Sequence, residues 1–283
     1  MWSITKVLNS SVVLASDDAG VEAVLLGKGI GYGAKPGQQV DSGVVDQVFV
    51  NRGAETGTLI DLLREIPGWY LELTHEVVAL AKGRLPHALD DHIYLTLTDH
   101  LHFMVQRLRD GLVVRNRFVW EMKSFYPQEY ALGVEALGRL RHRVEDVDLP
   151  DDEAANIAFH LVNASRGGPD FNALRAVQLI KAMSDIVRYT FPGSSDVEDL
   201  HWARFVTHLQ FFTERYLTQG LLESDDDFLY AQMVDRYPAA IGAAEKIADH
   251  LLKSDGVELP NEEIAYLALH MQRISDAGSS PSR

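Results

Sequence analysis

The stretch LPDDEAANIAFHLVNA, residues 149–164, decides the fold because a close copy, LPNEEIAYLALHMQRI, occupies residues 259–274. In both copies a Leu-Pro pair and a polar, acid-rich run precede apolar residues at helical spacing, which predicts the start of an amphipathic helix. The copies align without a gap at an offset of 110 residues, so that His160 matches His270. Self-similarity at a fixed offset indicates a duplicated module.

A second histidine recurs upstream of each copy. Residues 98–107 (TDHLHFMVQR) and 206–215 (VTHLQFFTER) align at an offset of 108, which matches His100 with His208. The other seven of the eleven histidines have no counterpart in the second copy. A lone histidine on an apolar helix face is usually a core residue. One that returns at the same place in a duplicated module indicates a function.

The N-terminal part of the chain has a β pattern. Short runs rich in Ile, Val and Leu alternate with Gly- and Asp-containing turns, which predicts antiparallel strands. We expect four of them, near Ile4–Leu8, Ser11–Ala15, Val21–Leu26 and Val44–Val50. One face of so small a sheet has nothing to cover it, so the sequence predicts that two copies pair as a homodimer.

The fold class we expect is multidomain, with a small antiparallel β-sheet domain followed by two homologous all-α helical-bundle domains. Gly53–Gly57 is the expected linker, and two glycines and a proline in Arg166–Asp170 mark the second boundary. The predicted domains are 1–56, 57–170 and 171–277. We expect the Gly- and Ser-rich tail, Ala277–Arg283 and in particular residues 278–283, to be disordered.

Composition excludes several classes of protein. The net charge of -15 argues against indiscriminate binding to nucleic acid or to anionic membranes. There is no apolar run near the roughly 18 residues that span a bilayer, and Met1–Lys6 lacks the layout of a signal peptide. The absence of cysteine rules out disulfides and fits a cytoplasmic protein.

Three interpretations of the four recurring histidines compete. The first is structural, as helix caps or as partners of buried carbonyl groups. The second, metal binding, is disfavoured because no HExxH motif or cysteine is present and because His100 and His102, two residues apart, face different ways on a helix. The third is phosphoryl transfer to a neutral imidazole. In that case Asp99 could orient the ring of His100, although Thr207 occupies the matching place in the second copy.

Short motifs in a fixed order carry a family resemblance; they are Ile4–Asn9, Gly27–Tyr32, Leu97–His100, Ala158–Ala164, Thr207–Leu209 and Ala268–His270. Over essentially its whole length the chain resembles the bacterial transcriptional antiterminators of the BglG, SacY and LicT type. The first two motifs resemble their co-antiterminator RNA-binding domain. The others resemble their two phosphotransferase-system regulation domains.

The resemblance implies a function and its partners. A dimeric N-terminal domain would hold a leader-transcript RNA hairpin and so prevent an overlapping terminator from forming. The phosphocarrier HPr and a sugar-specific permease would phosphorylate the helical domains. His100 and His160 would then be the inhibitory phosphorylation sites, and His208 and His270 the activating ones. No cofactor, metal or catalytic residue is expected.

The residues expected to bind RNA are Lys6, Asn9, Ser11, Gly27, Lys28, Gly29 and Tyr32. Lys6 and Lys28 would contact phosphates, Asn9 would read base edges, and Tyr32 would stack on a base. Glycines here would let the backbone approach the RNA closely. The alternative for this stretch is a hairpin turn whose tyrosine covers the sheet.

Two other functions remain open from the sequence. The helical domains could sense phosphotransferase state in a protein-interaction regulator that no longer binds RNA. A DNA-binding activator with the same helical domains is disfavoured because no helix-turn-helix precedes them.

Overall fold

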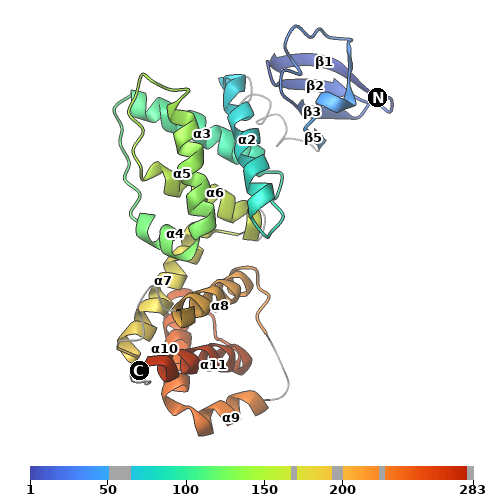
Figure 1. Ribbon diagram of the computed structural model, residues 1–283. Coiled ribbons are helices and arrows are strands. Elements are labelled where there is room, and N and C mark those ends of the chain that lie inside the picture. The colour runs from blue at the N-terminus through green and yellow to red at the C-terminus, as the bar shows by residue number, and fades with distance from the viewer. Residues whose placement is uncertain (51–64, 167–170, 193–199, 223–226, 279–283) are drawn as a thin grey trace. The chain divides into compact units, whose positions relative to one another are not determined.

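The computed structural model describes residues 1–50, 65–166, 171–192, 200–222 and 227–278 (Figure 1). Its contacts divide the chain into two compact units. The first joins Met1–Val119 to Gln128–Gly168, and the second joins Trp120–Pro127 to Pro169–Arg283. The N-terminal sheet therefore shares a unit with the first helical domain, and residues 120–127 cluster with the second. The predicted linker, Gly53–Gly57, lies outside the described residues.

The predicted fold class is confirmed, beginning with an antiparallel sheet of order β4-β1-β2-β3-β5. Its strands are β1 (Trp2–Asn9), β2 (Val12–Ser16), β3 (Glu22–Leu26), β4 (Gln39–Val40) and β5 (Gln47–Val50).

Two details of the strand prediction were wrong. The two-residue strand β4, which pairs with Trp2 and Ser3, was not predicted, because so short a segment has no period to detect. Val44 lies in a 3-10 turn rather than a strand. The Asp41 side chain caps this turn by accepting a hydrogen bond from the Gly43 N–H.

Both faces of the sheet are covered within one chain. Ile4, Val13, Leu25 and Ile30 belong to a small core on one face. On the other face Val12, Val24 and Leu26, all fully buried, belong to the same core as Ile66 and Tyr70 from the start of the helical region. The uncovered face from which the homodimer was predicted is therefore absent among the described residues, and the homodimer stays a prediction.

The first helical domain is built from α2 (Gly68–Arg84), α3 (Ile93–Arg109), α5 (Pro127–Arg141) and α6 (Glu153–Arg166). Each carries apolar residues at helical spacing that join a continuous core. A buried hydrogen bond of 2.9 Å from Thr98 Oγ1 to Thr74 Oγ1 ties α3 to α2.

The second unit contains α4 (Val119–Phe125), α7 (Ala173–Thr190), α8 (Leu200–Leu217), α9 (Phe228–Arg236), α10 (Pro238–Asp255) and α11 (Asn261–Gly278). Local sequence sets several helix ends. Asn172 caps α7 by accepting from the Arg175 N–H at 2.9 Å, and Gly256, at φ 70°, ends α10 in the left-handed conformation.

The C-terminal helix is longer than expected. α11 runs to Gly278, so it includes Ala277 and residue 278, which were expected in a disordered tail. Residues 279–283 lie outside the described part of the chain. No helix among the described residues is both long enough and apolar enough to cross a membrane.

Two glycines of α5 allow a matched test of the α5–α6 packing. A Cβ on Gly133 would lie 2.2 Å from the Ala154 carbonyl oxygen, whereas a Cβ on Gly138 meets no atom within 4 Å. We expect Gly133→Ala to lower the free energy of unfolding by about 1–3 kcal/mol through overpacking. Gly138→Ala should raise it by up to about 1 kcal/mol through helix propensity. Urea unfolding measures both, and equal shifts for the two variants would contradict this account of the packing.

Candidate functional site

The first histidine pair lies between α3 and α6. The ring centroids of His100 and His160 are 4.7 Å apart, with 40° between the ring planes. Burial lowers the pKa of His100 to about 3, with added repulsion from the charges of His160 and Arg107. Burial also lowers the pKa of His160 to about 4. The Nε2 atom of His100 is buried without a hydrogen-bond partner in the described structure.

The second pair lies between α8 and α11 and is packed more closely. The rings of His208 and His270 stack with centroids 3.3 Å apart and 19° between the planes. Burial, followed by the charges of His208 and Arg273, lowers the pKa of His270 to about 4. Burial and the Arg273 charge also lower the pKa of His208. His208 Nδ1 lies 2.9 Å from the hydroxyl of Tyr266.

The structure therefore brings the four predicted histidines together as two pairs of neutral rings at pH 7. A neutral imidazole nitrogen has a free lone pair and is a competent nucleophile toward phosphorus. No group of three or more histidine and carboxylate side chains that could hold a metal ion occurs among the described residues. The arrangement suits phosphoryl acceptance better than metal binding.

A buried ion pair that the sequence analysis did not single out lies beside each histidine pair. Arg107 binds Glu153 in the first domain. Arg215 binds Glu263 in the second through two hydrogen bonds of 2.8 and 2.7 Å. These residues obey the same offsets of 108 and 110 as the histidines, and that repetition is the signal that could have identified them.

In each domain the ion pair and the pair of rings are two successive contacts between the same two helices. Arg107 follows His100 by seven residues, and His160 follows Glu153 by seven. The same spacing holds in the second domain. Seven residues are two helical turns, so each pair of residues shares a helix face. The ion pair therefore fixes the register in which the two antiparallel helices present their histidines.

The structure does not support the orienting role predicted for Asp99. Its charge acts on His102, where it opposes the pKa decrease caused by burial. The charges that act on His100 are those of His160 and Arg107. His102 packs edge-on against Tyr70 at 5.2 Å, which fits its lack of a counterpart in the second copy.

The predicted RNA-binding residues gather around the β1–β2 turn and the loop after β3. The Gly27 N–H donates to the Ser11 carbonyl and the Gly31 N–H to the Ser10 carbonyl, both at 3.0 Å. Gly29 has φ +70°, where glycine is favoured. A Cβ on Gly27 would lie 1.9 Å from the Val44 carbonyl oxygen. Packing inside the protein alone therefore requires glycine at this position.

These residues differ in exposure. Lys6, Lys28, Gly29 and Tyr32 are exposed, and Tyr32 reaches 85%. Asn9 is half-buried and Ser11 is buried. The last two are bonded to the first helical domain.

The β1–β2 turn meets the N-terminal end of α2 through three contacts. Asn9 Nδ2 donates to the Ile66 carbonyl at 3.3 Å, and Ser11 Oγ donates to Glu72 Oε1 at 3.1 Å. A Cβ on Gly68 would lie 2.2 Å from Ser10 Oγ. The turn and α2 are therefore in direct contact.

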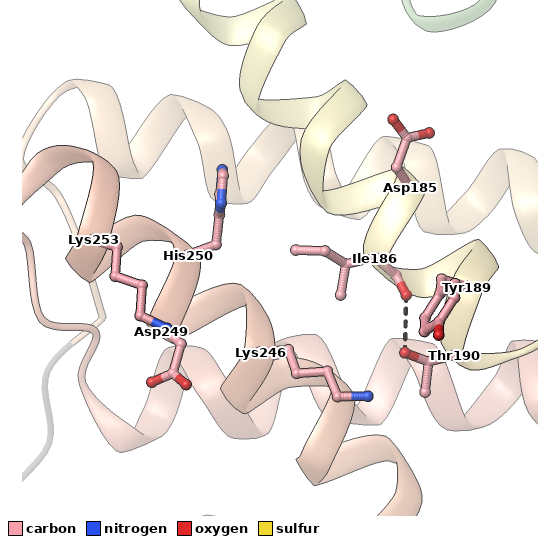
Figure 2. A pocket seen from close by; sticks show the side chains of 8 residues that line it. All are labelled: Asp185, Ile186, Tyr189, Thr190, Lys246, Asp249, His250 and Lys253. Atoms are coloured by element: carbon pink, nitrogen blue, oxygen red, sulfur yellow. Dashed lines mark hydrogen bonds between the residues drawn. The ribbon is translucent and has the colours of Figure 1, made fainter.

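A hollow of about 500 Å³ lies elsewhere, between α7 and α10 of the second unit (Figure 2). Its lining includes Lys246, Lys253 and the unduplicated His250, and none of the four paired histidines. Acidic side chains, Asp185 and Asp249, balance the lysines. The hollow is therefore separate from the candidate histidine sites.

Comparisons with known proteins agree with this architecture. Residues 2–56 match the model of the CAT RNA binding domain, and residues 75–164 and 177–274 match that of the PRD domain. The chain belongs to the family of antiterminators that join these domains.

Several relatives are similar over nearly the whole chain. The beta-glucoside operon antiterminator of Dickeya chrysanthemi is 36% identical over 96% of this chain and 96% of its own. Transcription antiterminator LicT of Bacillus subtilis (strain 168) is 35% identical over 96% of this chain and 98% of its own. The crystal structure of GlcT CAT-PRDI has a TM-score of 0.50 and 31% identity, covering 58% of this chain and 98% of its own.

The depressed histidine pKa values predict an acid-sensitive fold. His160 has an ordinary pKa of 6.5 and a folded value of about 4. Between these values the unfolded chain binds a proton that the folded chain does not. The free energy of unfolding should therefore fall as the pH decreases through this window, by up to about 1.4 kcal/mol per pH unit for each such histidine. Urea unfolding at several pH values should show a shallower fall for His160→Gln.

The exposed His142 of the same domain provides the control. His142→Gln should leave the slope of the wild-type protein unchanged. Equal slopes for wild type and His160→Gln would contradict the burial of the neutral ring.

Proposed function

We propose that this protein is a transcription antiterminator that binds a leader-RNA hairpin and is controlled by phosphorylation of its paired histidines. The observation that carries the proposal is the duplicated pair of neutral imidazole rings, held by a duplicated ion pair. In the sequence, the domains that carry these pairs follow a domain that matches the CAT RNA binding domain. The relatives that match nearly the whole chain are named as antiterminators.

The RNA surface is the exposed part of the loop after β3 together with β1. Lys6 and Lys28 supply point charges for phosphates, and the exposed ring of Tyr32 supplies a stacking surface for a splayed base. Because the chain is strongly acidic overall, recognition depends on stacking and shape as well as charge. A structured hairpin with unpaired bases fits this surface better than a regular duplex.

The phosphoryl donors are the phosphocarrier HPr and a sugar-specific permease of the phosphotransferase system. In each transfer a ring nitrogen supplies its lone pair to phosphorus, and the donor atom leaves with the electron pair of its broken bond to phosphorus. Phosphorylation at His100 and His160 inhibits, and phosphorylation at His208 and His270 activates. The protein works as a homodimer in the cytoplasm, where leader transcripts are made.

Two separate hydrogen bonds connect α3 with α2, and α2 with the RNA-binding domain. Thr98, two residues before His100 on α3, bonds Thr74 of α2. Two residues before Thr74, Glu72 accepts from Ser11 of the β1–β2 turn. A shift of α3 on phosphorylation therefore reaches the turn through α2. Asn9 also bonds Ile66, just before α2, so the turn is coupled to this part of the first helical domain at two places.

A gel shift with the leader RNA upstream of the neighbouring sugar genes tests the RNA assignment. Lys28→Ala should weaken binding several-fold and reduce its salt dependence, because one phosphate contact is lost. Glu72→Ala should strengthen binding, because it removes a carboxylate beside the RNA-binding turn.

Matched controls exist for both variants. Lys35→Ala removes an exposed lysine of the same loop region, and Glu76→Ala removes a carboxylate of α2 that pairs instead with Arg139 and Arg143. Lys35→Ala should not weaken RNA binding as Lys28→Ala does, and Glu76→Ala should not strengthen it as Glu72→Ala does. If no leader RNA binds, even with phosphomimetic Asp at His208 and His270, the protein is an interaction regulator that senses phosphotransferase state without RNA.

Phosphorylation is tested by incubating the full chain with phosphoenolpyruvate, enzyme I and HPr. We expect acid-labile label on the wild-type protein and none after all four paired histidines are changed to Gln. A variant with His92, His142, His201 and His250 changed to Gln should keep the label. Label that persists without the four paired histidines would exclude them as acceptors.

A further inference from the structure

The second histidine pair differs from the first at one flanking position. Tyr266, four residues before His270 on α11, places its hydroxyl 2.9 Å from His208 Nδ1. Its ring also meets the His208 and His270 rings edge-on, with centroids 5.8 and 4.7 Å away. The matching residue of the first copy is Asn156, whose amide donates to Glu153 Oε2 at 2.6 Å. The first pair therefore has no equivalent of the tyrosine.

Buried groups hold Tyr266 in place. The Arg215 guanidinium lies 4.8 Å from the centroid of its ring, at a distance typical of a cation–π contact. Both oxygens of the fully buried Glu263 accept hydrogen bonds from Arg215, and Oε1 also accepts from the Leu222 N–H at 2.9 Å. The hydroxyl that meets His208 is thus the end of a fixed chain of polar groups.

This contact distinguishes the two nitrogens of His208. An oxygen 2.9 Å from Nδ1 occupies the direction from which a phosphorus atom would have to approach that nitrogen. Nε2, on the opposite side of the ring, has no such neighbour among the described hydrogen bonds. We propose that Tyr266 is a positioning residue that directs phosphoryl transfer to Nε2 of His208. The proposal rests on the proposed function, in which His208 accepts a phosphoryl group.

The transfer requires a particular tautomer of the ring. The proton is on Nδ1 and is donated to the Tyr266 oxygen, which leaves the lone pair on Nε2. Nε2 uses this lone pair to form the new N–P bond, while the donor nitrogen keeps the electron pair of the old one. The Nδ1 proton stays in place. The ring gains a positive charge that the dianionic phosphoryl group and the Tyr266 oxygen stabilise.

An exposed cation completes the arrangement. Arg273 follows His270 by three residues on α11, and its charge acts on both His208 and His270. A guanidinium at this place can attract the incoming phosphoryl group. The matching residue of the first copy is the uncharged Asn163. The second pair therefore has a cation at a position where the first pair has none.

The first test needs no phosphoryl donor. Long-range ¹H–¹⁵N correlation spectra of the full chain, with ¹⁵N-labelled histidine, report which nitrogen of His208 carries the proton; His208→Gln assigns the signals. Wild type should show the proton on Nδ1. Tyr266→Phe should shift the tautomer population of His208 toward the form that carries the proton on Nε2. Tyr230→Phe, which removes a hydroxyl bonded to Glu245 in the same domain, should leave the wild-type signals unchanged.

The second test uses potassium phosphoramidate as a small chemical donor, with ³¹P and ¹⁵N spectra recorded at early times. Wild type should form the Nε2-phosphohistidine at position 208. Tyr266→Phe should react about 3- to 10-fold more slowly at Nε2 and should also form the Nδ1 isomer, because the orienting bond is lost. Tyr230→Phe should match wild type in rate and isomer.

The outcomes separate the two proposals. Nδ1 phosphorylation of wild type, or an unchanged tautomer, rate and isomer in Tyr266→Phe, would overturn the positioning role. If HPr fails to label wild type, the proposed function fails, and the tautomer and phosphoramidate results still decide the role of Tyr266. Circular dichroism of Tyr266→Phe identifies misfolding, and a misfolded variant is replaced by Tyr266→Trp, which keeps a ring but has no hydroxyl.

Discussion

Each helical domain depends on one buried ion pair. Glu153 and Glu263 are almost completely inaccessible to solvent, and each is neutralised by an arginine from a neighbouring helix. A buried carboxylate without its partner costs about 3–5 kcal/mol, so the two helices cannot slide past each other without exposing or isolating a charge. Since the histidines stand seven residues from these ionic groups on the same helix faces, the ion pair also determines which ring meets which. Both histidine pairs are positioned by this constraint.

Much of this arrangement could be predicted from the sequence, because residues that recur at a constant offset occupy equivalent positions in the two copies. The constant offsets were enough to match His100 with His208 and His160 with His270 and to predict two helical domains. The offsets alone could not reveal the ring separations of 4.7 and 3.3 Å. Those separations depend on how the side chains pack, which an offset does not describe.

The sequence was least informative where distant segments meet. Val12, Val24 and Leu26 read as one apolar face of a small sheet, and nothing in their periodicity shows that Ile66 and Tyr70 cover it. The same holds for the bond between Ser11 and Glu72, since a serine in a turn and a glutamate on a helix are ordinary surface residues in a sequence. Asp99 shows the same limit at short range. It adjoins His100 in the sequence, but successive helical residues point in different directions, and its charge acts on His102.

The two histidine pairs face different electrostatic problems once a phosphoryl group arrives. The first pair offers a buried Nε2 without a hydrogen-bond partner, and its flanking positions carry Asn156 and Asn163. The Arg107 charge that acts on His100 is already paired with Glu153, and burying close to two further negative charges is costly. We therefore expect α3 and α6 to separate to admit them. The second pair has Arg273 beside it and Tyr266 bonded to one ring. A phosphoryl group can therefore be neutralised in place.

That difference gives a physical reason for the opposite responses that we propose for the two domains. Separation of α3 from α6 disturbs Thr98, and through Thr74 and α2 it reaches the turn that carries Ser11. Charge neutralisation at Arg273 instead draws α8 and α11 more firmly together, because the phosphoryl group on one helix binds the cation on the other. On this proposal one domain would loosen when phosphorylated and the other would tighten, although both are copies of the same module. The two domains share two histidine rings and one ion pair, and they differ in a few side chains around them.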